Sequence, residues 1–409
     1  MLLLLAVLLT ACHSGDKEEI NSSDEDCFLD IYVYAPERPI VTRADVGDIK
    51  STDAESKVNT LQIWVFKSSN GDRVGYLNAD PHFLNETGQQ KYRMKISNDF
   101  AKAPEKVDVY VVANAASCEL TLDDKTSRDD LAGAMIGGAN FGTGTISGDI
   151  TTGLQSTVPD TGLPMSAVAK NQPIDGSFPT LRIGTSEKMT VMQLTRAVSK
   201  LRFVLCRITE KETSTKKLVG INSISLAEKQ IPTQSCLFPR ESYSYTYITD
   251  PIKYGPVAKG AIHEVANPLV YVYETQNAQD YEDLINAASD ETEDPDEKAA
   301  NLHRLEELGI TGLTVANLPQ LKEFGLTYLR ESDLRLTGTI NYTYNENNVE
   351  KTDDVSFTMA NPGDFLRNHS WIIYIYYMDS KIYVFTVTHI GMKNWTDDGI
   401  PENTTFYNW

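Results

Sequence analysis

The sequence predicts an all-β protein built from sandwiches, and three observations support this prediction. Short segments in which apolar and polar residues alternate recur along the chain, with turn residues between them. The 20 Tyr, 25 Gly and 17 Pro favour strands joined by turns. Hydrophobic residues make up 41% of the 409 residues and charged residues 23%, as in a globular protein. At roughly 150 residues per domain, this length corresponds to two or three domains.

The first strand is predicted over Cys27–Tyr34. Alternate residues form one aliphatic face, as a strand with one buried side requires: Cys27, Leu29, Ile31 and Val33. Pro36 and Pro39 end this strand. Residues 41–48 then form an exposed loop that contains Arg43, a residue after which trypsin-like proteases cut flexible chains.

Further strands are predicted in both halves of the chain. Their ranges are 61–66, 91–96, 107–114, 201–205, 221–227, 269–273, 334–344, 355–359, 371–378 and 382–390. Residues 133–153 are rich in Gly, Thr and Ser and lack a phosphate-binding motif, so they are expected to form a loop. Residues 280–308 have the one convincing helical pattern, interrupted by the acidic run 290–297, which is expected to be a solvated loop.

The N-terminus carries an export signal. Residues 1–11 read MLLLLAVLLTA, an apolar stretch too short to cross a bilayer as a helix. The stretch leads into Leu9-Thr10-Ala11-Cys12, which resembles the bacterial lipobox, although no basic segment precedes it. Lipoprotein signal peptidase cuts before a cysteine whose thiol has been acylated, so Cys12 is the predicted lipidation site. The alternative is an ordinary secretory peptide with an incidental cysteine.

Charge and motifs exclude several classes of function. The net charge of −20 repels phosphate backbones, so no nucleic-acid partner is predicted. None of the six His lies in H-E-x-x-H, and neither G-x-S-x-G nor a Cys/His cluster at metal spacing occurs. The sequence therefore predicts no enzyme, no cofactor and no metal site. The later cysteines Cys27, Cys118, Cys206 and Cys236 are expected to be small buried hydrophobes, with two disulfides as the alternative.

Several segments, taken in order, resemble one family. They comprise the lipobox at Cys12, residues 42–48, 55–58, 61–66, 109–114, 163–166, 194–200, 271–274 and 367–369, and the strand that leads to Trp395. Together they are similar to the fimbrillins of the Bacteroidales. These are lipoprotein-derived pilus subunits that include the FimA-type stalk proteins and the Mfa-like group.

The resemblance implies a domain plan and a processing route. It implies a signal peptide at residues 1–11, a propeptide at 12–43, and two tandem transthyretin-like β-sandwich domains at 44–195 and 196–409, the second with a small helical insertion. An arginine-specific protease would cut between Arg43 and Ala44. The implied location is the cell outer membrane for the lipidated precursor and then an extracellular fimbrium. The implied partners are copies of the chain or other fimbrial subunits, and a receptor on a host or bacterial surface.

The resemblance also implies polymerisation by strand exchange. A cut after Arg43 frees the strand Cys27–Tyr34 to leave its sandwich, and a strand from a neighbouring subunit then fills the exposed groove. The predicted donor is the C-terminal tail, whose aromatic residues are unusual in a solvated segment: Phe406, Tyr407 and Trp409. The alternatives are a frayed terminus and a final strand folded back onto its own domain.

Two other functions compete with that of a stalk subunit. The first is a tip or accessory subunit, or a membrane anchor that keeps its lipid at Cys12. The second is a surface lipoprotein that binds glycans through exposed aromatics, the candidates being Trp64, Trp371, Trp395 and Trp409. Trp64 and Trp371 lie in predicted strands and are expected in the core.

Overall fold

The structure is a computed structural model of the chain. It describes residues 26–35, 53–118, 120–137, 141, 145–147, 150–152, 157–208, 210, 214–240, 243–249, 252–265, 323–358, 365–378, 381–390, 394–395 and 401–402. Within these ranges most residues lie in β-sheets, which confirms the all-β fold class. The transthyretin-like topology stays a prediction. The strand 269–273 and the helical region 280–308 lie outside the described residues.

The first sandwich is built from two five-stranded sheets. One sheet has the order β10 (Ile174–Ser177), β11 (Thr180–Ile183), β1 (Cys27–Tyr34), β12 (Val191–Gln193), with β4 (Gln89–Ile96) also paired to β1. The other has the order β13 (Thr195–Arg196), β9 (Met165–Gln172), β5 (Val107–Ala113), β2 (Leu61–Lys67), β3 (Arg73–Ala79). Every residue of β5 is buried, as its nearly continuous apolar run predicts for a central strand.

The second sandwich also has two sheets. One has the order β19 (His263–Val265), β14 (Val198–Ile208), β23 (His369–Met378), β24 (Lys381–Ile390), with β20 (Glu323–Arg330) also on β14. The other has the order β22 (Val349–Thr358), β21 (Thr337–Glu346), β15 (Lys216–Leu226), β17 (Lys253–Tyr254), β7 (Thr145–Ser147), β8 (Ile150–Thr152), with β18 (Val257–Ala258) on β15. Their facing sides enclose a separate hydrophobic core that includes Phe203, Ile340 and Trp371.

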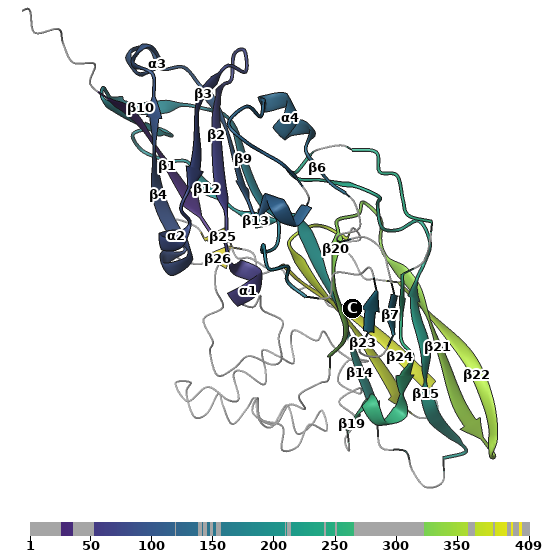
Figure 1. Cartoon of the computed structure of the whole chain (residues 1–409). Helices are drawn as coiled ribbons and strands as arrows, with labels where there is room; N and C mark the ends of the chain where they lie inside the picture. The colour runs from purple at the N-terminus through teal and green to yellow at the C-terminus, as the bar shows by residue number, and fades with distance from the viewer. Residues whose placement is uncertain are drawn as a thin grey trace, which may run out of the picture.

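The two sandwiches follow one another along an elongated molecule (Figure 1). β13 ends the first sandwich at Arg196, and β14 starts the second at Val198. The segment expected to be a loop over residues 133–153 contains three short strands, because the backbone groups of two of them pair with the second half of the chain. β6 (Met135–Ile136) pairs with β16 (Ser235–Cys236), β7 pairs with β17, and β8 pairs with β7. The first half of the chain thus contributes strands to the second sandwich, and the domain boundaries stay a prediction.

Helices are short in the part of the chain that the structure describes. They are α1 (Asp53–Ser56), α2 (His82–Thr87), α3 (Asn98–Lys102) and α4 (Arg128–Gly133). None of these helices has the length and apolar character that crossing a membrane requires. The remaining described sheet is the short pair β25 (Asn394–Trp395) and β26 (Pro401–Glu402).

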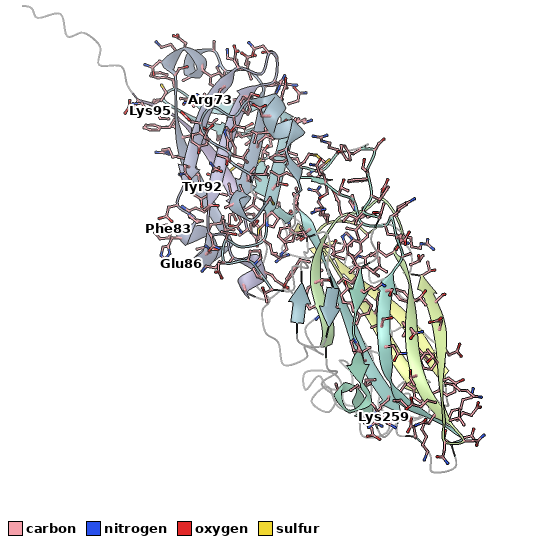
Figure 2. The ribbon with its side chains drawn as sticks, turned by 45° about the vertical axis from the view of Figure 1, so that its right-hand side comes forward. Arg73, Phe83, Glu86, Tyr92, Lys95 and Lys259 are labelled. Atoms are coloured by element: carbon pink, nitrogen blue, oxygen red, sulfur yellow. The ribbon has the colours of Figure 1, made fainter. Side chains whose placement is uncertain are left out.

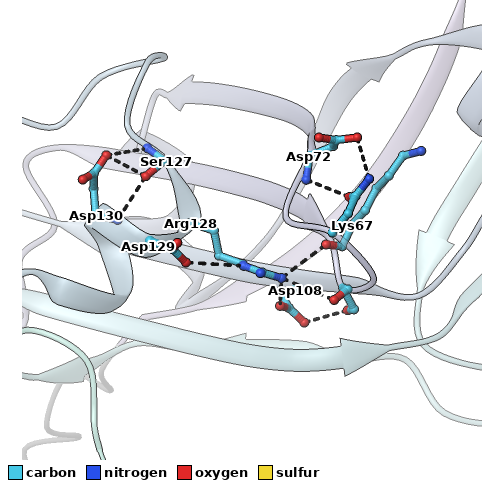
Figure 3. Close-up of polar contacts among 9 residues, drawn as sticks. Lys67, Asp72, Asp108, Ser127, Arg128, Asp129 and Asp130 are labelled. Carbon is cyan, nitrogen blue, oxygen red and sulfur yellow. Dashed lines mark hydrogen bonds and ion pairs between the residues drawn. The ribbon is translucent and has the colours of Figure 1, made fainter.

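α4 is fastened to the strands beside it by polar contacts (Figure 3). Its first turn is closed by a capping box, in which Ser127 and Asp130 each satisfy the other's backbone N–H. Nη1 of Arg128 lies 3.3 Å from Oδ2 of Asp108 on β5 and donates to the carbonyl oxygen of Ser68 at 3.3 Å. Asp108 also accepts from the Ser68 hydroxyl at 2.6 Å. These bonds hold the β2–β3 turn against the end of β5.

Candidate functional site

β1 is an interior strand of its sheet, paired along both edges. On one edge it runs antiparallel to β4 over its whole length, from Cys27 opposite Ile96 to Tyr34 opposite Gln89. On the other edge it runs parallel to β11 in its first half and to β12 in its second half. Without β1, the ladder groups of β4 on one side and of β11 and β12 on the other have no strand to pair with.

The inner face of β1 fills the core of the first sandwich. Four side chains on this face are fully buried, with 0% exposure: Cys27, Leu29, Ile31 and Val33. They pack in one cluster with residues of the opposite sheet, such as Ile63, Val65 and Val109. Burial of apolar side chains of this size is worth about 1.5–3 kcal/mol each. The inner face of β1 therefore supplies four of the buried side chains of this core.

The outer face of β1 carries one carboxylate, Asp30, and on each side a neighbouring strand has an arginine opposite it. Asp30 lies opposite Arg93 of β4 on one side and opposite Arg182 of β11 on the other. Its carboxylate accepts two hydrogen bonds from Arg93, at 2.8 Å from Nε and 3.0 Å from Nη2. Arg182 in turn lies opposite Asp175 of β10 and donates to it from Nε at 2.8 Å. Four neighbouring strands thus carry charges of alternating sign across one line of the sheet.

Further cations of β4 face the same strand. Nζ of Lys91 lies 3.5 Å from Oδ2 of Asp30, and Nζ of Lys95 lies 2.5 Å from Oδ1 of Asp26, the residue before β1. Figure 2 shows Lys95 at the outer surface, at the end of the first sandwich far from the second. The guanidinium of Arg93 also lies over the Phe28 ring, 5.5 Å from its centre. β4 therefore presents a row of three cations to β1.

Low pH is expected to destabilise the pairing of β1, because Asp30 becomes protonated. Burial raises the pKa of Asp30, but hydrogen bonds and attraction from Arg93 and Lys91 outweigh burial and lower the pKa below its ordinary value of 3.8. A lowered pKa contributes stability that is present above the ordinary value and lost as the pH falls through the folded one. The Asp30→Asn variant should therefore be less stable near neutral pH and lose less stability below about pH 4. Urea unfolding of both proteins from neutral to acidic pH measures this, and parallel losses of stability would contradict it.

α1 lies at a buried junction between the two sandwiches. Glu55 of α1 is buried, and its Oε1 lies 2.8 Å from Nζ of Lys200 on β14. The Tyr328 hydroxyl of β20 donates to the same oxygen at 2.5 Å. Burial and the Glu55 carboxylate raise the pKa of Tyr328, which keeps its phenol a hydrogen-bond donor. Arg196 donates to the Glu55 carbonyl oxygen at 2.9 Å and to the Ser56 hydroxyl at 3.0 Å.

Segments that carry the sequence resemblance meet at this junction. Arg196, from residues 194–200, contacts Ser56 as described and donates to Oδ1 of Asn368 at 3.2 Å. Asn114, with a φ of 58°, accepts at Oδ1 from the backbone N–H of Asn59 at 2.8 Å and donates to the carbonyl oxygen of Leu163 at 2.8 Å. These motifs therefore connect strand ends and the two sandwiches. The buried network around Glu55 was not predicted. The sequence feature that could indicate it is the pair of segments 55–58 and 194–200, which carry the family resemblance and supply Glu55, Arg196 and Lys200.

The other predicted site residues fall in three groups. Cys12, Arg43, Ala44, Phe406, Tyr407 and Trp409 lie outside the described residues. Trp64 and Trp371 are buried in the core, so neither is available to stack on a glycan. Cys27, Cys118 and Cys236 are buried, and burial raises the pKa of Cys118 to about 12. Among the described residues, no group of His, Cys, Asp and Glu side chains is placed to hold a metal ion.

The chain resembles solved structures of bacterial fimbrial proteins. It is similar to the tip fimbrial protein Mfa3 of Porphyromonas gingivalis, with 15% identity, a TM-score of 0.41, and coverage of 89% of this chain and 99% of that one. It is similar to a fimbrilin (fimA) of the same species, with 11% identity, a TM-score of 0.42, and coverage of 86% and 89%. A fimbrial assembly protein of Parabacteroides distasonis matches with 12% identity, a TM-score of 0.39, and coverage of 94% and 100%.

One protein-family model matches part of this chain. No curated protein matches the chain. Residues 41–191 match the model of the major fimbrial subunit protein (FimA). The matched residues include the β2–β3 and β5–β9 strand pairs and begin after β1. The match confirms the resemblance to the fimbrillins of the Bacteroidales over residues 41–191.

Proposed function

We propose that this chain is a structural subunit of a cell-surface fimbria that polymerises by strand exchange and serves adhesion. In this proposal it is exported as a lipoprotein with its lipid on Cys12 and is activated by cleavage between Arg43 and Ala44. The neighbouring subunit, a copy of the chain or another fimbrial subunit, supplies the strand that replaces β1. The outer membrane holds the lipidated precursor, and the cut releases the body from that anchor.

The observation that carries the proposal is the position of β1. It is a buried strand paired on both edges, yet it precedes both Arg43 and the residues that match the FimA family model. A strand so deep in a sheet is normally continuous with its domain. Here a single cut after Arg43 would leave β1 attached only by non-covalent contacts.

Loss of β1 creates a surface that is unfavourable in water. It opens a groove lined by apolar side chains and bordered by unpaired backbone N–H and C=O groups. A strand added from another chain restores the main-chain hydrogen bonds, while pockets for alternate side chains set its register. Burial of four apolar side chains gives the exchange a strong driving force before entropy costs.

Contacts that do not involve β1 hold the part of the chain after Arg43 in place. Downstream of Arg43, Glu55 of α1 contacts Lys200 and Tyr328, and Ser56 contacts Arg196. These contacts come from both sandwiches. They support a subunit whose new N-terminal segment stays fastened at the junction while β1 departs.

Deletion of residues 396–409 is expected to leave a folded, exportable monomer that does not polymerise. At about 3.3 Å per residue, the 14 residues after Trp395 extend to roughly 46 Å, enough to reach a neighbour's groove. Full-length and truncated proteins are digested with a trypsin-like protease, and SDS-resistant ladders are followed. Far-UV circular dichroism checks that the truncated protein is folded. A truncated protein that ladders as well as the full-length one would rule out the C-terminal tail as the donor.

A further inference from the structure

We infer that the groove left by β1 selects a donor strand that carries a carboxylate at the position of Asp30, between Arg93 and Arg182. This inference rests on the proposed strand exchange and names the chemistry of the segment that enters. The donor is an extended segment of a neighbouring subunit. Its inner face is apolar, and its outer face is acidic at the middle of the strand.

Departure of β1 removes the acidic member of a charged row. With β1 present, the signs across the four strands alternate through Asp175, Arg182, Asp30 and Arg93. Without it, β11 and β4 are separated by the width of one missing strand, about 9–10 Å. Arg182 keeps Asp175 as its partner, whereas Arg93 loses its bidentate carboxylate. The gap is then bordered by a guanidinium group on each side.

The other ion-paired side chains of β4 along the groove, Lys91 and Lys95, are also positively charged. Among the described residues, the ion pairs of Lys91, Arg93 and Lys95 are all to Asp30 and Asp26. All three cations therefore lose these anionic partners when residues 26–35 leave. A strand with a basic outer face would be repelled along this border, and an acidic strand would be attracted. The whole chain has a net charge of −20, so acidic segments are common in its own copies.

The Asp30–Arg93 ion pair differs from a solvated surface pair in its burial and its geometry. The Asp30 side chain is 9% exposed, although that of Arg93 is 48% exposed. Exposed single ion pairs contribute little, but two parallel N–H···O bonds to a mostly buried carboxylate are stronger and fix direction. The carboxylate also fixes the register. A slip by one residue would turn it into the apolar core, and a slip by two would carry it past both arginines.

Peptides with the sequence of residues 26–34 test the inference on the protein after it has been cut at Arg43. The first peptide is the native sequence, the second carries Asp30→Asn and the third Asp30→Lys, with Cys27→Ala in all three to prevent oxidation. A shuffled peptide of the same composition is the control. Each is added before polymerisation starts, and the concentration that halves the SDS-resistant ladder is measured. The native peptide is expected to inhibit best, and the Asp30→Lys peptide should need roughly tenfold more.

An acceptor variant supplies the reciprocal experiment. With Arg93→Glu, the preference should reverse, so that the Asp30→Lys peptide inhibits better than the native one. Arg93→Gln is the milder variant and should reduce the difference between the two peptides. Addition of salt should also reduce it, because the border is partly exposed.

The outcomes separate this inference from the proposed function. If the native peptide and its charge variants inhibit equally on the unmodified protein, strand exchange stands and the acidic preference is overturned. If no peptide inhibits while the cut protein still ladders, β1 does not occupy the exchange groove, and the proposed mechanism falls together with the inference. Inhibition by the shuffled peptide at the same concentration would also overturn the register argument.

Discussion

Replacement of Arg43 by alanine is expected to abolish polymer formation and leave a lipidated precursor in the outer membrane. β1 then stays covalently joined to the body, paired with β4 on one edge and with β11 and β12 on the other. Its four inward side chains keep the groove filled, so a neighbour's strand has no place to enter. SDS-resistant ladders, together with the mass of the subunit in membrane fractions, measure the effect.

Arg38 provides a matched control for this variant. The Arg38→Ala change removes the same charge five residues earlier in the chain, but Arg38 precedes Pro39, and an Arg–Pro bond is a poor substrate for trypsin-like proteases. The Arg38→Ala protein should therefore be processed and polymerise like the unmodified one. Normal fibres from the Arg43→Ala protein would refute release of β1 by cleavage at this position.

Replacement of Glu55 by alanine is expected to destabilise the protein by about 3–5 kcal/mol, because it removes one member of a buried ion pair. Lys200 is 9% exposed at its side chain and lies 2.8 Å from Glu55, so it has little access to water as a substitute. The Tyr328 hydroxyl loses its acceptor in the same step. Urea unfolding followed by tryptophan fluorescence measures the loss, since Trp64 and Trp371 are buried in the two sandwiches.

Two further variants separate the effect of the buried charge from that of losing any carboxylate. Glu86→Ala removes a carboxylate that pairs with His82 on the surface of α2 and should leave the midpoint near that of the unmodified protein (Figure 2). Glu55→Gln keeps an oxygen for the Tyr328 hydroxyl but removes the charge, so its loss should be intermediate. Equal midpoints for Glu55→Ala and Glu86→Ala would show that the buried network contributes nothing to stability.

Strands with a strong local pattern could be predicted from the sequence. β2, β5, β23 and β24 were predicted within a few residues of their bounds, because apolar residues dominate them or alternate regularly. β3 was not predicted, since its residues are half-buried or exposed and Gly75 interrupts the pattern. β10 and β11 were also missed. They are four residues long, and β11 depends on parallel pairing with β1, which lies far away in the sequence.

In the candidate site too, features set by local pattern could be predicted, and those set by long-range pairing could not. The inner face of β1 follows from alternation within eight residues, so it was predictable. The charged row on the outer face was not, because Asp30 and Arg93 are 63 residues apart and alternation does not reveal which residues lie opposite in a sheet. Glu55 is a further case. Glutamate is almost never buried without a partner, and its partners Lys200 and Tyr328 come from the second sandwich.

The N-terminal sequence of subunits taken from cell-surface fibres tests the exchange of β1 most directly. If cleavage releases β1 and a neighbour's strand replaces it, the subunits should begin at Ala44, and mass spectrometry of washed fibres should find no peptide from residues 26–35. Fibres whose subunits still begin at a lipidated Cys12, or retain β1, would contradict strand exchange at this groove.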